Sequence, residues 1–289
     1  LDDHHDQLDV LGDGGDELFG GYNRYLLTTS LWPHIRSLPL YVRQSVAFLL
    51  TRLSPATLST LSQLLPGKRR WHNFGEKLHK GSAVLSSSSL SDLYCSLTSA
   101  WPDPSILLAG NTNTTCNATE FAQGLDNLTN AELMMAMDML SYLPDDVLCK
   151  LDRAAMATSL ETRAPFLDHN VVELAWKLPM HSKIRRENEG LVSKWLLRQV
   201  LYKYVPRSLV DRPKMGFSVP IDDWLRGPLR SWAEELLDTR RLEREGFFNV
   251  PTIRQKWDEH LSGRRNWHTQ LWTVLMFQAW LQYQNASND

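Results

Sequence analysis

The segment from Leu8 to Tyr25, LDVLGDGGDELFGGYNRY, constrains the fold of this chain more than any other. A short apolar run meets a glycine-rich acidic turn, and a helix-like stretch follows. This order predicts a strand, a tight loop and the start of a helix. A parallel strand needs neighbours on both sides, but only seven residues precede Leu8. We therefore expect a strand remnant rather than a complete sheet.

The remainder of the chain is dominated by helical patterns. The segments with helical periodicity or helix-start signals are 129–140, 144–155, 191–205 and 267–283. Thr129 or Asn130 can cap the first segment, with Glu132 in its first turn, and Pro144 is placed to open the second. Few strands are predicted after residue 25. The predicted fold class is therefore mainly α.

Composition and charge argue against several classes of protein. The 289 residues include 31 Lys and Arg against 33 Asp and Glu, a net charge of −2, whereas a nucleic-acid binder is normally basic. No run of about 18 apolar residues is present, so no membrane span is expected. The three cysteines, Cys95, Cys116 and Cys149, favour a reducing compartment over a disulfide-rich scaffold. We expect a cytoplasmic protein that binds neither nucleic acid nor membranes.

The acidic turn is the first candidate for chemistry. The glycines of residues 12–15 let a ligand approach the backbone closely, and a loop entering a helix offers free N–H groups to phosphate oxygens. Asp13, Asp16 and Glu17 would repel bare phosphate, but Mg²⁺ is held by one or two carboxylates together with substrate phosphates. A Mg²⁺–nucleotide site is one interpretation. An acidic turn with a helix cap is the simpler one on these residues alone, and the EF-hand calcium pattern is not met.

A second cluster alternates opposite charges. Residues 150–153 read KLDR, and residues 160–168 read LETRAPFLD. For Glu161, Arg163 and Asp168, structural ion pairing is the simpler interpretation, since breaking a buried pair costs about 3–5 kcal/mol. For the lysine and arginine of the KLDR run, a structural and a functional role are more evenly matched.

A third cluster is the loop 211–217, DRPKMGF. Its proline and glycine pre-set the position of Lys214. A lysine there can place a compact charge on a phosphoryl or carbonyl oxygen in a transition state. Taken alone, Lys214 is more simply interpreted as an ordinary surface lysine.

Taken together, the three clusters resemble the synthetase domain of glutamine-dependent asparagine synthetases. The family's loop, Ser-Gly-(Asp/Glu)-Gly-x-Asp-Glu-(Leu/Val)-Phe-Gly-Gly-Tyr, is matched from Gly12 to Tyr22. Its later pattern, Leu-Pro-Asp-Asp, Lys-x-Asp-Arg, Met-Ala and Leu-Glu-x-Arg-x-Pro-Phe-Leu-Asp, is matched from Leu143 to Asp168. Its Arg-x-Lys loop is matched from Arg212 to Lys214. The resemblance covers residues 8–283, and three motifs in the same order are highly specific.

The resemblance implies a two-step reaction. ATP with Mg²⁺ adenylates the side-chain carboxylate of aspartate and releases pyrophosphate, and ammonia then attacks the acyl-adenylate to give asparagine and AMP. It also implies the C-terminal part of an α/β adenine-nucleotide-binding domain, the Rossmann-like ATP pyrophosphatase fold. The implied partners are aspartate, ATP, ammonia from glutamine, the glutaminase domain of the full-length protein, and a second copy of the chain in a homodimer.

The family's functional positions also map onto this sequence. Asp13 matches the acidic residue tied to intermediate formation and ammonia deprotonation, and Lys214 matches the cation that stabilises the transferred phosphoryl group. The ATP- and pyrophosphate-binding positions fall on Gly12, Gly14, Asp16 and Arg153. Asp16 would also hold Mg²⁺ through pyrophosphate. The positions at the substrate pocket fall on Glu17, Tyr22 and Lys150.

Two departures from the family pattern shape what we expect of this chain. Leu11 stands where the family has a serine, so a hydroxyl that could bond a phosphate is replaced by an apolar group. The family's upstream Ser-Gly-Gly-x-Asp-Ser pyrophosphate loop and its glutaminase domain have no counterpart here. We expect residues 1–7 to be a non-matching segment and 8–289 to be a partial synthetase domain. We also expect the chain to be inactive by itself.

Two alternatives to an asparagine synthetase remain. One is a related amidotransferase that acts on another carboxylate, such as a sugar acid. The other is a helical scaffold that has lost catalysis, which the eleven tryptophans and Leu11 would permit. Retention of Asp13, Asp16 and Lys214 argues against the scaffold, because a scaffold needs no cation–phosphate set.

Overall fold

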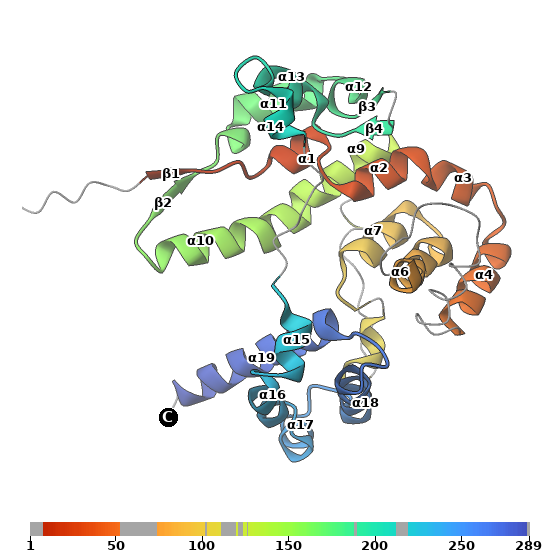
Figure 1. Cartoon of the computed structure of the whole chain (residues 1–289), viewed down its shortest axis with the longest axis vertical. Coiled ribbons are helices and arrows are strands. Elements are labelled where there is room, and N and C mark those ends of the chain that lie inside the picture. The colour runs from red at the N-terminus through yellow and green to blue at the C-terminus, as the bar shows by residue number, and fades with distance from the viewer. Residues whose placement is uncertain are drawn as a thin grey trace, which may run out of the picture. The chain divides into compact units, whose positions relative to one another are not determined.

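The computed structural model describes residues 8–52, 74–101, 103–110, 120, 124–125, 127–187, 190–211 and 219–287. These residues are mostly helical, with short strands, as predicted (Figure 1). The chain divides into two compact units. Unit 1 comprises residues 1–49, 84–97 and 116–213, and unit 2 comprises residues 50–83, 98–115 and 214–289.

The strand predicted at the start is present and belongs to a two-stranded parallel sheet. β1 (Leu8–Val10) pairs with β2 (Glu161–Arg163), so that Leu8 lies opposite Glu161 and Val10 opposite Arg163. The N–H of Leu11 extends the ladder by donating to the Arg163 carbonyl at 2.8 Å. This pairing brings the start of the chain to the second charged cluster.

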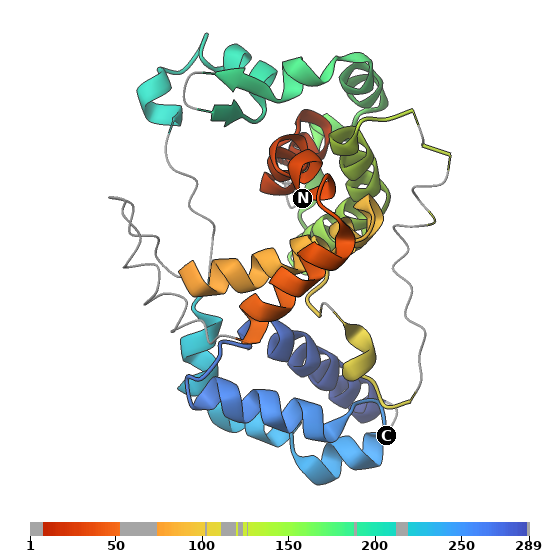
Figure 2. The ribbon, with the colours of Figure 1, turned by 90° about the vertical axis from the view of Figure 1, so that its right-hand side faces the viewer.

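The sequence did not predict the other short strands. β3 (Arg185–Glu187) and β4 (Gly190–Val192) form an antiparallel pair, drawn as neighbouring teal arrows in Figure 2. Like β2, each has three residues. A strand of that length is too short to show the alternation of apolar and polar residues by which strands are recognised.

One long helical rod dominates unit 1 and is seen in green in Figure 1. It consists of α9 (Asn130–Met137), the π-helical segment η2 (Asp138–Leu148) and α10 (Cys149–Met156). The predicted cap is confirmed, because Thr129 and Glu132 form a capping box at its start. The prediction that Pro144 opens a new helix is wrong, since Pro144 lies inside η2. We attribute this to the wider π turn, which shifts the carbonyl that a proline ring would meet in an α-helix.

Unit 1 also contains a core of aromatic and methionine side chains. Tyr25, Trp32, Met134 and Met137 in this core are 0% exposed. The other helices that lie wholly or mostly in unit 1 are α1 (Gly15–Phe19), α2 (Asn23–Ser30), α3 (Trp32–Arg36), α4 (Leu40–Arg52), α7 (Leu90–Thr98), η3 (Pro165–Leu167), α11 (His169–Lys177), α12 (Met180–Lys183), α13 (Trp195–Leu201) and α14 (Arg207–Val210). The helix predicted over 191–205 is shorter in the structure, where α13 ends at Leu201. Pro206 is the N-cap residue of the following helix, α14.

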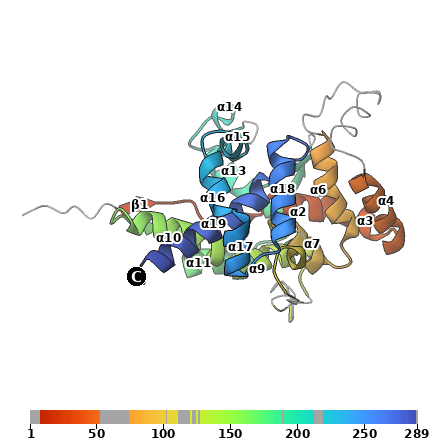
Figure 3. The ribbon, with the colours of Figure 1, turned by 90° about the horizontal axis from the view of Figure 1, so that it is seen from below.

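Unit 2 contains the last five helices among the described residues, drawn in cyan to dark blue in Figure 3. Their bounds are α15 (Ile221–Arg226), α16 (Arg230–Leu236), α17 (Thr239–Glu245), α18 (Val250–Leu261) and α19 (His268–Ala286), preceded by η1 (Pro104–Ile106). The helix predicted over 267–283 is confirmed as α19. Ile253, Trp257, Leu271 and Leu275 in the core of these helices are 0% exposed. A further helix, α6 (Phe74–Ser86), spans residues of both units.

None of the described helices has both the length and the hydropathy of a membrane span. Cys95 on α7 is disulfide-bonded, whereas Cys149 is a free, exposed thiol. Structural disulfides are rare in reducing compartments, so this bond does not support the predicted cytoplasmic location.

Candidate functional site

The acidic turn lies where β1 passes into α1. Gly14 adopts a φ of 85° immediately before the helix, a conformation that residues with a Cβ rarely tolerate. A Cβ on Gly14 would also lie 2.4 Å from Leu167 Cδ2. The turn therefore packs directly on η3. The structure thus brings together two motifs that are far apart in the sequence.

One face of the acidic turn carries an ion pair. Asp16 Oδ1 lies 2.9 Å from Lys194 Nζ, and about a third of each side chain is exposed, 33% and 30%. Lys194 has a φ of 53°, and its N–H donates to the Phe19 carbonyl at 3.1 Å. Residues with a Cβ rarely adopt this left-handed backbone conformation. Where they do, the residue often lies at a functional site. The lysine is therefore held beside the turn by its backbone as well as by its charge.

The other face of α1 points into the protein. Glu17 is 1% exposed, and burial raises the pKa of its carboxyl group. Its Oε1 accepts a hydrogen bond of 2.8 Å from the Tyr22 hydroxyl. Burial and the neighbouring carboxylate raise the pKa of Tyr22, so this hydroxyl stays protonated and acts as the donor. Of the predicted pocket residues, Glu17 is therefore buried and Tyr22 half-buried.

Behind this pair lies a buried network that the sequence did not indicate, which we call the Asp138 cluster: Arg24, Tyr25, Tyr94 and Asp138. Arg24 Nε donates to Asp138 Oδ2 at 2.7 Å, and the Tyr25 hydroxyl donates to the same oxygen. The Tyr94 hydroxyl donates to Asp138 Oδ1 at 2.8 Å. Asp138 is 0% exposed, so these donors replace the water that its carboxylate has lost.

Among the remaining residues of the turn, Gly12 and Asp13 form its open side, whereas Gly15 is buried. Gly12 is exposed, and a Cβ on it would meet nothing within 4 Å. Asp13 is half-buried. The turn thus offers accessible backbone and carboxylates to a ligand on this side.

Two further predicted residues lie on the exposed surface of α10. Lys150 Nζ pairs with Asp146 Oδ1 at 2.6 Å, with side-chain exposures of 73% and 38%. Arg153 is exposed. Among the described residues, no hydrogen bond or ion pair joins either cation to the acidic turn. Surface pairs of this kind typically contribute about 0–1 kcal/mol to stability, so both cations are available to a ligand.

The structural roles predicted for the second cluster are confirmed in part. Glu161 and Arg163 form an ion pair on the surface. Asp168 does not form an ion pair among the described residues. It caps α11 instead, accepting the Asn170 N–H at 2.9 Å, and this bond lowers the pKa of its carboxyl group.

Comparison with known proteins decides the family. The sequence profile described as asparagine synthase matches residues 8–282. This chain belongs to the asparagine synthase family. It is 31% identical over 96% of its length to a Mycobacterium tuberculosis protein provisionally named as a glutamine-hydrolysing asparagine synthetase. It is 26% identical, also over 96%, to the Bacillus subtilis protein named asparagine synthetase [glutamine-hydrolyzing] 1.

The match covers only part of these relatives. This member of the asparagine synthase family spans 39% of the mycobacterial protein and 40% of the Bacillus protein. It is also 25% identical over 82% of its length to a Penicillium rubens protein named amidase chyE, of which it covers 36%. No solved structure matches the chain.

Two lysines of this family member are candidates for the site, and the structure describes one of them, Lys194. Lys214 and the rest of residues 212–218 lie outside the described residues, so its catalytic role stays a prediction. Lys194 lies beside the acidic turn, although no sequence motif marks it. Only its left-handed backbone and its contact with Asp16 distinguish it.

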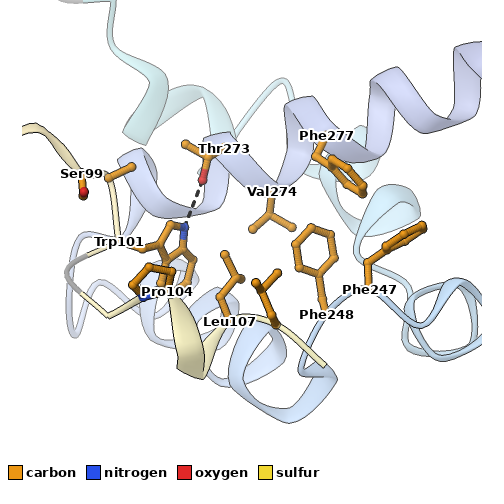
Figure 4. A pocket seen from close by; sticks show the side chains of 11 residues that line it. Ser99, Trp101, Pro104, Leu107, Phe247, Phe248, Thr273, Val274 and Phe277 are labelled. Atoms are coloured by element: carbon orange, nitrogen blue, oxygen red, sulfur yellow. Dashed lines mark hydrogen bonds between the residues drawn. The ribbon is translucent and has the colours of Figure 1, made fainter. Parts of the chain in front are cut away.

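Unit 2 of this family member contains a cavity that is separate from the predicted site residues. A pocket of about 470 Å³ in unit 2 is lined mainly by apolar side chains, among them Trp101, Phe248 and Phe277 (Figure 4). None of the predicted site residues lines it. The described part of the chain contains no group of three or more His, Cys, Asp or Glu side chains that could hold a metal. Mg²⁺ needs only one or two carboxylates when it binds with phosphates, so Asp16 fits that role.

Proposed function

We propose that this chain carries the ATP-dependent, amide-forming site of an asparagine synthetase. The carboxylate of aspartate would be activated as β-aspartyl-AMP, and ammonia would displace AMP to give asparagine. The family match supports the reaction class. The observation that carries the location is the acidic turn, which pairs Asp16 with Lys194 and packs on the second family motif.

ATP and Mg²⁺ fit the open side of the turn. Gly12 would meet the nucleotide through its backbone, and Gly14 gives the turn its shape. Asp16 would hold Mg²⁺ through pyrophosphate, while Lys194 and Arg153 would balance phosphate charge. A bound Mg²⁺ supplies charge neutralisation at the phosphates.

The acid and the cation at the reacting atoms complete the proposal. Asp13, half-buried at the turn, would act in forming the intermediate and in deprotonating ammonia. Lys214 would stabilise the transferred phosphoryl group. Tyr22 and Lys150 would form walls of the substrate pocket, and Glu17 would support Tyr22 from behind through their hydrogen bond.

The complete fold, the source of ammonia, the cellular location and the oligomeric state belong to the same proposal. The chain would form the C-terminal part of a Rossmann-like nucleotide-binding domain, and a glutaminase domain would deliver ammonia from glutamine. A cytoplasmic location and a homodimer remain predictions. An amidotransferase that acts on another carboxylate is the second candidate, favoured by the similarity to a protein named amidase chyE. Product formation with a panel of carboxylates, in a protein that includes the glutaminase domain, separates the two.

Calorimetric titration of the purified chain with ATP, with and without Mg²⁺, tests the site. We expect Mg²⁺-dependent binding that weakens at least tenfold in Asp16→Asn, which loses the charge facing Lys194. Asp223→Asn is the matched control, because Asp223 is 78% exposed and lies in unit 2. Equal affinity in Asp16→Asn and the wild type would reject the assignment of Asp16. No binding to the wild-type chain would reject a nucleotide site formed by this chain alone.

A further inference from the structure

We propose that Arg24 and Asp138 are positioning residues that hold the acidic turn in place against η2. This inference rests on the proposed function of the turn. Both residues lie outside the two matched motifs, Gly12–Tyr22 and Leu143–Asp168. Their contacts nevertheless connect the first motif to η2, the segment within which the second motif begins.

The first connection runs from the acidic turn to Arg24. The buried Glu17 carboxylate accepts its hydrogen bond from Tyr22. The Arg24 guanidinium carbon lies 4.0 Å from the centre of the Tyr22 ring. A guanidinium over an aromatic ring at this distance is attracted to its face. Arg24 therefore holds the ring whose hydroxyl group serves Glu17.

The second connection runs from Arg24 to η2. The same guanidinium lies 4.8 Å from the centre of the Tyr142 ring, and Arg24 Nε bonds to Asp138. Tyr142 and Asp138 both belong to η2. Arg24 is thus held between a ring beside the acidic turn and a ring and a carboxylate of the π-helical segment.

Burying the Arg24–Asp138 ion pair costs free energy that a purely structural contact would not require. Replacing a buried ion pair by apolar residues of similar size often leaves stability unchanged or improves it. Arg24 Nη2 is also buried without a hydrogen-bond partner among the described residues, and such a group calls for an explanation. Long π-helical segments are rare and frequently occur at functional sites. These costs are understandable if the contacts set the spacing between the turn and the motif that begins within η2.

Hydrogen exchange of the full chain tests this connection without any ligand. Arg24→Met and Asp138→Asn should each speed amide exchange at least tenfold in both segments 12–22 and 138–150. Arg43→Met is the matched control, since Arg43 is also a buried arginine of unit 1 and bonds to carbonyls away from the turn. At matched stability, this control should leave exchange in both segments unchanged.

Tyr22→Phe separates the two connections. It removes only the hydroxyl group that serves Glu17, so exchange should rise in segment 12–22 and stay unchanged in 138–150. Equal exchange in both segments for Arg24→Met and Arg43→Met, with their unfolding free energies matched by urea, would overturn the proposal.

Affinity for Mg²⁺–ATP then tests whether the positioning serves the site. Arg24→Met should weaken binding at least tenfold, and Arg43→Met by less than twofold. If the two variants bind equally well, positioning for nucleotide binding is refuted. If the wild-type chain binds no Mg²⁺–ATP, the proposed nucleotide site fails, while the exchange measurements still decide the positioning. The two failures are therefore distinguishable.

Discussion

At the scale of single residues, the candidate site depends on close approaches that leave no room for a larger side chain. Gly21 illustrates this, because a Cβ on it would lie 1.7 Å from Asp16 Oδ1 and 2.4 Å from Lys194 Cε. Both atoms are ends of flexible side chains. An added methyl group would therefore displace the ion pair and leave the backbone in place.

Gly21→Ala should accordingly separate Asp16 from Lys194. We expect Lys194 to react faster with an amine-acetylating reagent, as measured by mass spectrometry, because its ammonium group loses its partner. The unfolding free energy should change by no more than about 1 kcal/mol, since the pair is partly exposed. Gly81→Ala is the control, because a Cβ on Gly81 would meet nothing within 4 Å. Acetylation of Lys194 at the same rate in both variants would contradict this prediction.

At the scale of elements, His260 is where three helices of unit 2 join. The Trp267 N–H, at the start of α19, donates to His260 Nδ1 at 3.3 Å, and Arg226 Nε of α15 donates to the His260 carbonyl at 2.9 Å. The His260 ring on α18 is 0% exposed, and its Nε2 has no hydrogen-bond partner among the described residues. Burial, followed by the charge of Arg226, lowers the pKa of His260 to about 4.

Acid should therefore weaken this junction. The ordinary pKa of histidine is 6.5, so the unfolded chain binds the proton more tightly than the folded chain. The contribution of His260 to stability is complete above pH 6.5 and is lost as the pH falls toward 4. The expected loss is about 3 kcal/mol, from about 1.36 kcal/mol per pKa unit. Urea unfolding at a series of pH values measures it.

His260→Gln provides the comparison for this pH dependence. The glutamine can accept a hydrogen bond but does not titrate. Between pH 6.5 and 4 its stability should fall by about 3 kcal/mol less than that of the wild type. Parallel curves for the two proteins would show that His260 does not titrate as expected.

At the scale of the whole molecule, the chain accounts for about two-fifths of the length of its asparagine synthetase relatives, 39% and 40%. The described residues place the acidic turn, β2 and η2 within unit 1. A complete synthetase reaction also requires ammonia and a full set of pyrophosphate contacts. The sequence Ser-Gly-Gly-x-Asp-Ser does not occur in these 289 residues, and the expectation that they hold no glutaminase stays a prediction.

The purified chain should therefore make no asparagine by itself. Incubated with ATP, Mg²⁺, aspartate and glutamine, it should release neither glutamate nor AMP above the background of a heat-denatured sample. Ammonium chloride in place of glutamine should not restore AMP formation, because the expected deficit includes pyrophosphate contacts as well as ammonia. Chromatography of the nucleotides and amino acids measures both products, and sustained ATP-dependent AMP formation would contradict the prediction.

The sequence by itself determined the family, the mainly helical fold class and the first strand. Each depends on short contiguous patterns, such as the GDGGDELFGGY loop or the Thr129–Glu132 capping box, and local residues suffice to encode them. Only the tertiary structure decided that β2 pairs with β1, that Glu17 turns inward, that Lys194 meets Asp16, and that Arg24 binds Asp138. These contacts join segments far apart in the chain or depend on which face of α1 is buried. Packing selects such contacts, and no local pattern contains that information.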